Sequence, residues 1–411
     1  MTWLIVIGGL VLVVFVHELG HFSVALAVGM RPRSFYIGFP PALVKVRRNG
    51  IEYGIGMIPL GGLVRIPGMH RPAASDLRTF IEPAVREQPD LAPAVGAVRR
   101  ALDAEDYDAA RRAYPELEQD VGAARLSPAA RRSAERALRD LEEGTARDAF
   151  WRASTWKRFA VIAAGPFANI LLAFAILFTV FAVSGGPART QHYTNKVDSV
   201  ETGTPAAAAG LQAGDRIVAV NGVPTREFGS VSHLIGGSDG RAVVLTVVRH
   251  GRQVTVGPRK TIRSEGRWIF GFSPEPRLVS YTVGGAARTA GSDLWGVVTG
   301  TAAGFRGLFS HQGRSQLSGP VGIVQVSHSQ LQAGGSWYLQ ILAFVSMSLA
   351  LVNLLPLLPL DGGHILFSLI EGVRRRALAR EVYERVSVVG IAFILLVMVI
   401  AFSNDVSGAP H

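Results

Sequence analysis

Long apolar stretches alternate with polar segments along this chain of 411 residues, and four stretches are long enough to cross a lipid bilayer. They run from Trp3 to Val28, Phe159 to Val183, Ile341 to Leu360 and Val386 to Phe402, and the last requires a thin or tilted crossing. Apolar residues make up 48% of the chain, which suits a membrane protein with soluble attachments. The pattern predicts a polytopic α-helical membrane protein with about four transmembrane helices.

Residues 31–69 follow the first apolar stretch and contain β-forming runs on both sides of Asn49-Gly50. An Asn-Gly pair between such runs is a strong signal for a tight hairpin turn. We therefore expect a membrane-associated β-hairpin. Gly54 and Gly56 do not indicate a dinucleotide-binding loop, because Pro59 stands where that motif requires its third glycine.

Residues 70–150 change in character and are rich in Ala, Arg, Asp and Glu. Helical stretches such as Ser127–Glu143 stand out, and Ser127-Pro128 suits an N-cap followed by the first helical position. We expect a charged helical cytoplasmic insert, which is either a small solvated module or partly disordered. The segment shows no pattern of catalytic residues.

Residues 190–278 contain short strand-like runs separated by turn signals such as Gly214-Asp215 and Asn221-Gly222. The phrase Ala-Gly-Leu-Gln-Ala-Gly-Asp-Arg-Ile-Val-Ala-Val-Asn-Gly at 209–222 resembles the PDZ domains of bacterial envelope proteases, which add an extended peptide to a sheet edge. This resemblance implies one extracytoplasmic PDZ-like α+β domain. The alternative is a generic β domain.

Residues 284–335 precede the third span. Apolar residues recur at about helical spacing from Ala286 to Phe309, but Arg288, Asp293 and Arg306 interrupt them, which is typical of an interfacial amphipathic helix. Residues 317–323 are expected to form a loop. The chain is thus divided into eight segments: span 1 (1–30), hairpin (31–69), insert (70–150), span 2 (157–184), PDZ-like domain (190–278), amphipathic helix and loop (284–335), span 3 (338–372) and span 4 (386–403).

The formal charge of +11 does not indicate a nucleic-acid partner, because the basic residues lie beside the predicted spans. By the positive-inside rule these flanks are cytoplasmic, and both chain ends and the segment between spans 2 and 3 lie outside. The chain has no cysteine, which excludes disulfides and thiolate ligands. The basic flanks contain Arg31, Arg33, Lys45, Arg47 and Arg48; Arg152, Lys157 and Arg158; and Arg374, Arg375, Arg376, Arg380 and Arg385.

The most specific chemical pattern is His-Glu-Leu-Gly-His at 17–21, inside the first apolar stretch. His17 and His21 are four residues apart and so lie on one face of a helix, where two neutral imidazoles can hold one Zn²⁺. Glu18 is then placed to take a proton from a water molecule activated by the metal. Ionisable groups are costly at this depth in a bilayer, so they indicate function.

A signal peptide and a buried helix with a structural histidine are the alternatives for this stretch. The stretch lacks a basic n-region and is longer than the usual signal-peptide core. A single structural histidine does not account for a pair at ligand spacing with a glutamate between them. We therefore favour a metal site.

A catalytic zinc ion usually takes three protein ligands, so the two histidines require a third. The third apolar stretch ends in Asn-Leu-Leu-Pro-Leu-Leu-Pro-Leu-Asp-Gly-Gly-His at 353–364, where two prolines interrupt the helix before a carboxylate. Asp361 is the predicted third ligand, and His364 at most supports the ligands. Asn353 is expected to bind the substrate backbone or help polarise the scissile carbonyl, and the alternative is that it joins two helices by hydrogen bonds.

Several motifs in order resemble the site-2 protease family of intramembrane zinc metalloproteases, and more narrowly the bacterial regulator of sigma-E protease group. The resemblance covers nearly everything except residues 70–150. It implies that His17, His21 and Asp361 bind zinc, that Glu18 is the catalytic base and that Asn353 assists substrate binding. The motifs are those at 17–21, 58–62, 164–169, 209–222, 318–323 and 353–364.

The resemblance also implies that the hairpin pairs with an unwound strand of the substrate. The substrates would be single-pass membrane proteins such as anti-sigma factors, already trimmed by an upstream site-1 protease and admitted past the PDZ-like domain. Cleavage near the cytoplasmic side of a bacterial cytoplasmic (inner) membrane would release a signalling fragment. The expected substrate-binding residues of the hairpin are Tyr53, Gly54, Ile55, Pro59, Gly61 and Gly62.

The chain departs from the best-known group in having one PDZ-like domain instead of two in tandem, and in its longer insert. The alternative function is a non-catalytic membrane adaptor whose PDZ-like domain recruits envelope proteins. Glu18 argues against it, because a structural zinc site has no use for a base. A metal transporter is disfavoured because the membrane halves do not repeat. Fe²⁺ or Co²⁺ would also suit the predicted ligands.

Overall fold

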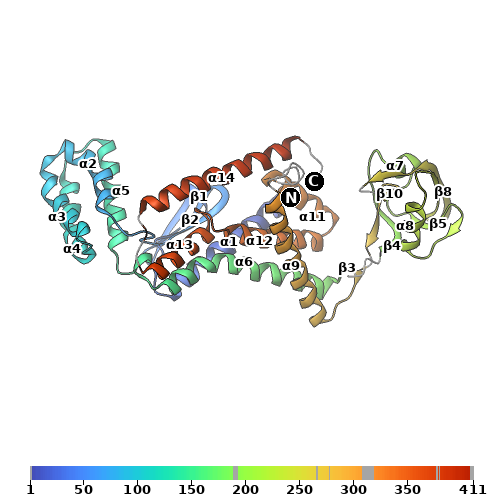
Figure 1. Ribbon diagram of the computed structural model, residues 1–411, viewed down its shortest axis with the longest axis horizontal. Helices are drawn as coiled ribbons and strands as arrows, with labels where there is room; N and C mark the ends of the chain where they lie inside the picture. The colour runs from blue at the N-terminus through green and yellow to red at the C-terminus, as the bar shows by residue number, and fades with distance from the viewer. Residues whose placement is uncertain are drawn as a thin grey trace. The chain divides into compact units, whose positions relative to one another are not determined.

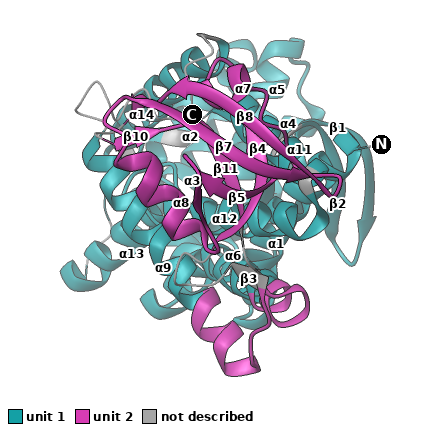
Figure 2. Cartoon of the chain, turned by 90° about the vertical axis from the view of Figure 1, so that its right-hand side faces the viewer, with its two compact units in different colours: residues 1–177, 291–411 teal, residues 178–290 magenta. Residues whose placement is uncertain are grey.

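The computed structural model describes residues 2–187, 193–264, 267–276, 278–307, 319–375, 378 and 380–407. The chain forms two compact units, Met1–Leu177 with Gly291–His411 and Phe178–Ala290 (Figure 2). Four helices are long and apolar enough to cross a membrane, the number predicted: α1 (Thr2–Ala27), α6 (Thr155–Ser184), α12 (Gly335–Asn353) and α14 (Arg380–Ser407) (Figure 1). The predicted fourth span, 386–402, was too short, because α14 extends beyond it at both ends.

Helix α1 has an apolar surface all round, but it buries only one face. Its buried residues follow helical spacing along that face and include both histidines of the motif. Large apolar side chains elsewhere on the helix are exposed, for example Leu4 at 74%. Such exposure over a whole helix is favourable only in contact with lipid.

The hairpin consists of β1 (Ser34–Arg48) and β2 (Ile51–Arg65). Its turn is confirmed at Asn49-Gly50, where both residues have positive φ, 52° and 81°. Residues 34–37 of β1 pair with residues 52–55 of β2 and also with residues 62–65. On their other side, residues 62–65 pair with no strand in the described part of the chain. They therefore form a free strand edge.

The insert is a helical module with its own core, made of α2 (Ala74–Glu87), α3 (Ala92–Asp103), α4 (Tyr107–Ala123) and α5 (Pro128–Thr145). Buried apolar residues from all four helices pack together, including Leu77, Val98, Leu117 and Leu141. The predicted N-cap of α5 is confirmed, because the Ser127 side chain accepts a hydrogen bond from Ala130 N with Pro128 as the first helical residue.

The third span differs from the sequence prediction at its C-terminal end. Helix α12 ends at Asn353 rather than Leu360, and a new helix, α13 (Asp361–Arg374), begins at Asp361. Pro356 and Pro359 explain the break, because neither can donate the backbone hydrogen bond that would continue the helix.

The prediction of a loop at 317–323 was partly wrong. Residues 317 and 318 lie outside the described residues, but α11 (Pro320–Ala333) begins directly afterwards, following α9 (Val283–Gly307). Pro320 starts this helix rather than breaking it, since proline suits the first helical position. The Asp405 carboxylate, on α14, accepts hydrogen bonds from Gly319 N and Gly322 N and so caps α11 from another helix.

The Phe178–Ala290 unit is an antiparallel α+β domain. Its main sheet has the strand order β11-β4-β5-β7-β8, with β6 paired to β5. The strands are β3 (Gly186–Pro187), β4 (Tyr193–Val200), β5 (Arg216–Val220), β6 (Val223–Pro224), β7 (Ala242–Arg249), β8 (Arg252–Lys260), β9 (Ile262–Ser264), β10 (Arg267–Ile269), β11 (Phe272–Pro276) and β12 (Leu278–Val279); the helices between them are α7 (Pro205–Ala209) and α8 (Phe228–Gly236).

A buried ion pair anchors this domain. Asp215, in the turn before β5, accepts hydrogen bonds from Gln212 N and from Nε and Nη2 of Arg249, at 2.8 and 2.7 Å for the two guanidinium nitrogens. Burial by itself raises the pKa of Asp215, but the Arg249 and Gln212 hydrogen bonds outweigh it and hold the pKa below its ordinary value of 3.8.

We expect Arg249→Leu to lower the unfolding free energy of the 178–290 fragment by about 2–3 kcal/mol at pH 7, because it leaves a buried carboxylate unpaired. Asp215 binds a proton less readily in the folded wild type than in the unfolded chain. The extra stability of the wild type is therefore present above pH 3.8 and is lost as the pH falls further. The difference between the two fragments should therefore shrink in acid. Urea unfolding followed by circular dichroism measures both effects.

Lys196→Met is the matched control, since Lys196 forms a half-exposed ion pair with Glu275 in the same domain. It should change the unfolding free energy by less than about 1 kcal/mol. An equal loss in both variants would contradict a special role for the buried pair.

Candidate metal centre

Three potential metal ligands from two distant segments meet in the membrane-spanning part of the chain. His17 and His21 are buried on one face of α1, and Asp361 is the first residue of α13. The two histidine Nε2 atoms lie 3.2 Å apart, and Asp361 Oδ2 lies 3.2 Å from that of His17 and 3.3 Å from that of His21.

These spacings fit a zinc ion. A tetrahedral zinc site with bonds of about 2.0–2.1 Å separates its ligand atoms by roughly 3.3–3.4 Å. The three observed separations are close to this value. No other group of three or more such side chains in the described residues brings its ligand atoms this close. The donor set of two imidazoles and one carboxylate is also one that zinc accepts at catalytic sites.

The loop before Asp361 depends on two glycines. A Cβ at Gly362 would lie 2.3 Å from the carbonyl oxygens of Leu354 and Leu355, and one at Gly363 would lie 2.5 Å from Leu358 N. The loop after α12 can therefore fold tightly onto the start of α13 only because these side chains are missing. This contact fixes the position of Asp361.

Helix α6 supports the two histidines from the other side. A Cβ at Gly20 would lie 2.4 Å from Ala164 O, and a Cβ at Gly165 would lie 2.2 Å from His21 Nε2. The helices can therefore approach closely, and His21 Nδ1 donates a hydrogen bond to Val161 O over 2.8 Å. This bond leaves His21 Nε2 free to face Asp361.

Asn169 is a site residue to which the sequence analysis assigned no role. It is fully buried on α6, and its amide lies 3.4 Å from His17 Nδ1. Its backbone carbonyl accepts a hydrogen bond from Ser346 Oγ on α12 over 2.9 Å. Asn169 could have been recognised as a candidate because it is a polar residue inside an apolar span. The sequence does not show which side chain it contacts.

Glu18 lies beside the three ligand atoms and packs against the free edge of β2. A Cβ at Gly62 would lie 2.3 Å from Glu18 Cγ, so only glycine leaves room for this carboxylate. Glu18 lines a cavity of about 730 Å³ together with His17, His21 and Asp361. Asn353 and His364 line the same cavity.

The predicted hairpin residues divide into two groups. Gly61 and Gly62 line the cavity, whereas Tyr53, Gly54 and Ile55 do not. The Tyr53 ring instead contacts Phe22 and Phe35. Pro59 belongs to β2, but its side chain lies outside the described part of the structure.

The chain matches the model of peptidase family M50 over residues 5–397 and therefore belongs to that family, whose members are site-2-type zinc metalloproteases. A putative zinc metalloprotease of Agrobacterium fabrum is 30% identical over 96% of this chain and 93% of its own. Another, of Mesorhizobium japonicum, is 29% identical over 97% and 96%. The regulator of sigma-W protease RasP of Bacillus subtilis is 27% identical over 98% and 97%.

The protein is accordingly an integral membrane metalloprotease that depends on zinc. Its family relationship covers the whole length from the first span to the last.

We expect Gly165→Ala to weaken zinc binding by at least about tenfold, because the added methyl group would displace the His21 ring. Alanine is the better helix former, so intrinsic helix propensity cannot explain a loss. Zinc retained by the purified protein after dialysis against a graded chelator series is the measurement. Gly8→Ala is the matched control, since a Cβ there meets nothing within 4 Å. Equal zinc retention by the two variants would contradict the prediction.

Proposed function

We propose that this protein is an intramembrane zinc endopeptidase that cleaves single-pass membrane proteins within their spans. The observation that carries the proposal is the triangle of His17, His21 and Asp361 donor atoms at zinc-ligand spacing on apolar helices. In this proposal these three residues hold zinc, which supplies Lewis acidity that polarises the scissile carbonyl and acidifies water.

Glu18 acts as the base in the proposed mechanism. Its carboxylate accepts a proton from the attacking water and then passes that proton to the leaving amine. The close fit against Gly62 restricts the movement of the Glu18 carboxylate. This supports a role for Glu18 in proton transfer beside the metal ligands. Asn353 lines the same cavity, where its amide can donate a hydrogen bond to the substrate backbone.

The substrate binds in this proposal as an added strand along residues 62–65. Their free edge offers backbone donors and acceptors directly beside Glu18. A helical substrate shields its peptide bonds within its own hydrogen-bond ladder, so it must become extended before water can reach one. Gly61 and Gly62 are the hairpin residues best supported in this role, because they line the cavity.

The substrate class that we propose is an anti-sigma factor already trimmed on its outer side by a site-1 protease. The name of the Bacillus subtilis relative, regulator of sigma-W protease, supports this class. We propose that the Phe178–Ala290 unit is the PDZ-like domain and lies outside the bacterial inner membrane, while the basic flanks of the spans face the cytoplasm.

We expect Glu18→Gln to slow cleavage of a pre-trimmed single-pass substrate in detergent by about 10²–10⁴-fold, because the glutamine amide cannot carry the proton. Zinc content should stay equal to that of the wild type, since Glu18 is not a ligand. Leu19→Ala is the control, because Leu19 is exposed on the same helix. Equal cleavage by wild type and Glu18→Gln would refute the mechanism.

Asn169 is proposed to orient His17. When His17 Nε2 faces zinc, Nδ1 carries the proton and needs an acceptor. The structure has Asn169 Nδ2 against this nitrogen, while Asn169 Oδ1 has no partner in the described residues. A half-turn of the amide exchanges these two atoms and supplies the acceptor.

We therefore expect Asn169→Ala to weaken zinc binding by about 10–100-fold, measured by competition with a chelator. Ser346→Ala removes only the hydrogen bond to the Asn169 backbone and should weaken zinc binding less than Asn169→Ala does. Wild-type zinc affinity in Asn169→Ala would exclude the orienting role.

A further inference from the structure

The insert is joined to the rest of its unit at a narrow neck. Phe150 N donates to Pro67 O over 2.9 Å, and Trp151 N donates to Gly68 O over 3.1 Å. The chain therefore leaves for the insert and returns from it at adjacent points, just beyond the end of β2. Two ion pairs flank the neck: Arg65–Glu143 at 3.1 Å and Arg33–Asp148 at 3.2 Å.

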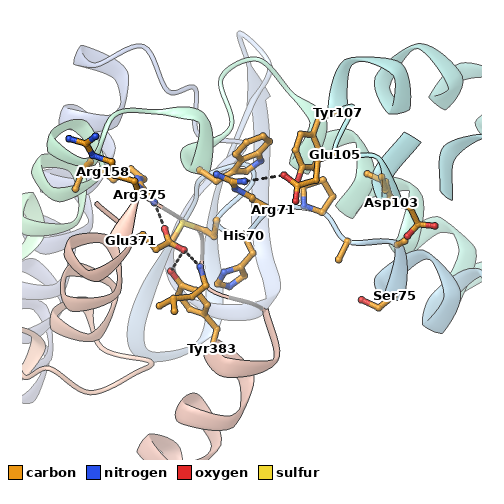
Figure 3. Close-up of a pocket in the computed structure, with 18 of the residues that line it drawn as sticks. His70, Arg71, Ser75, Asp103, Glu105, Tyr107, Arg158, Glu371, Arg375 and Tyr383 are labelled. Atoms are coloured by element: carbon orange, nitrogen blue, oxygen red, sulfur yellow. Dashed lines mark hydrogen bonds and ion pairs between the residues drawn. The ribbon is translucent and has the colours of Figure 1, made fainter. Parts of the chain in front are cut away.

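A cavity of about 770 Å³ lies between the insert and the ends of the membrane helices. Figure 3 shows Arg71, Glu105 and Tyr107 on one side, and Glu371 and Tyr383 on the other. Arg158 and Glu371, from the first turn of α6 and the last turn of α13, form a 2.6 Å ion pair in its wall. The cavity therefore lies where these membrane helices begin and end.

This cavity lies next to the active-site cavity. Met69 lines both of them, and the residues between Gly62 and Met69 run from the proposed cleavage point towards the neck. An extended chain advances about 3.3 Å per residue. The chain bends after Arg65, so an extended substrate strand paired with residues 62–65 would reach the second cavity after at most about seven residues.

The residues that line this second cavity indicate which part of a substrate can bind there. The Arg71 guanidinium lies 5.1 Å from the centre of the Trp151 ring and 4.0 Å from Glu105, so charges of both signs surround the space. An apolar membrane span in this cavity would remove the charged side chains from water. It would not replace the hydrogen bonds that water makes to them, which is costly. An extended polar peptide can keep them hydrated and hydrogen-bonded. Such a peptide has the polarity of the segment next to a substrate's membrane span.

We propose that the insert and the ends of α6 and α13 form a passage for the substrate's polar segment next to its membrane span. The passage admits extended chain and excludes folded protein, so a substrate is cleaved only if its folded domain on the insert's side is separated from the span by a sufficient linker. This inference rests on the proposed function, because it requires cleavage beside β2. It assigns the insert a role in selecting substrates rather than in catalysis.

A linker series tests the passage. A stable folded domain is fused to the substrate behind polar linkers of increasing length, and cleavage by the purified full-length protein is measured. We expect wild-type cleavage to be at least about tenfold slower with linkers shorter than about seven residues than with linkers of about twenty. Replacing residues 70–148 by a short Gly-Ser linker, which the adjacent neck ends permit, should make cleavage independent of linker length.

The outcomes separate this inference from the proposed function. A wild type that cleaves all linker lengths equally would overturn the passage and leave the protease intact. The same length dependence without residues 70–148 would also overturn it, because another part of the protein would then impose the limit. Absence of cleavage at every length would overturn the proposed function, and the passage with it.

A photo-crosslinking experiment keeps the inference testable if the replacement does not fold. A photoreactive residue replaces Ser75, which is exposed and lines the cavity, in a Glu18→Gln background that retains uncleaved substrate. Crosslinks should map to the polar segment next to the substrate's span. Glu116, exposed on the insert but lining neither cavity, is the negative control, and Leu63 in the active-site cavity is the positive control. Crosslinks from Leu63 without any from Ser75 would refute the passage.

Discussion

Glycine residues let the membrane helices approach closely enough to assemble the candidate metal centre. Gly20 and Gly165 let α1 and α6 come together, and Gly362 lets the start of α13 fold onto the end of α12. In a bilayer, apolar side chains gain little by leaving lipid for another helix, so small residues that permit close packing drive association instead. These contacts bring the carboxylate of Asp361 to the two histidines of α1.

The membrane helices and the modules outside them are stabilised differently. The Phe178–Ala290 unit and the insert each enclose an apolar core, including Ile217 and Leu245 in the former and Leu117 in the latter. The hydrophobic effect stabilises such cores in water. The membrane helices expose large apolar side chains and rely on backbone contact and buried polar bonds, such as that from Ser346 to the Asn169 carbonyl.

Hydrolysis inside a membrane requires water and an extended substrate, and both needs are addressed at the free edge of β2. Residues 62–65 pair with no described strand on one side, where the backbone of Val64 hydrogen-bonds to the carboxylate of Glu18. Met69 lines the cavity here and also lines the neighbouring cavity beside the insert, whose wall is rich in charge. A substrate following this route would pass from an apolar setting to a polar one, as its own sequence does at the end of a span.

The local features of the protein follow from its sequence alone. The spacing of His17 and His21, the turn at Asn49-Gly50 and the cap at Ser127 depend on residues close together in the chain, so helix and turn geometry predict them. Asp361 was predictable because zinc chemistry requires a third ligand and the chain offers a carboxylate after a broken span. The end of α12 and the start of α11 were misjudged, because hydropathy does not show how prolines and a distant carboxylate are used.

Which distant groups meet depends on how the elements pack. Asn169 faces His17, Asp405 caps α11, and Met69 lines two cavities, although no local pattern connects these partners. Residues predicted as one group on the hairpin were divided by its folding, which placed Gly62 against Glu18 and Tyr53 against Phe22. Side-chain periodicity reports which face of an element is apolar, but the partner of that face depends on how the elements pack.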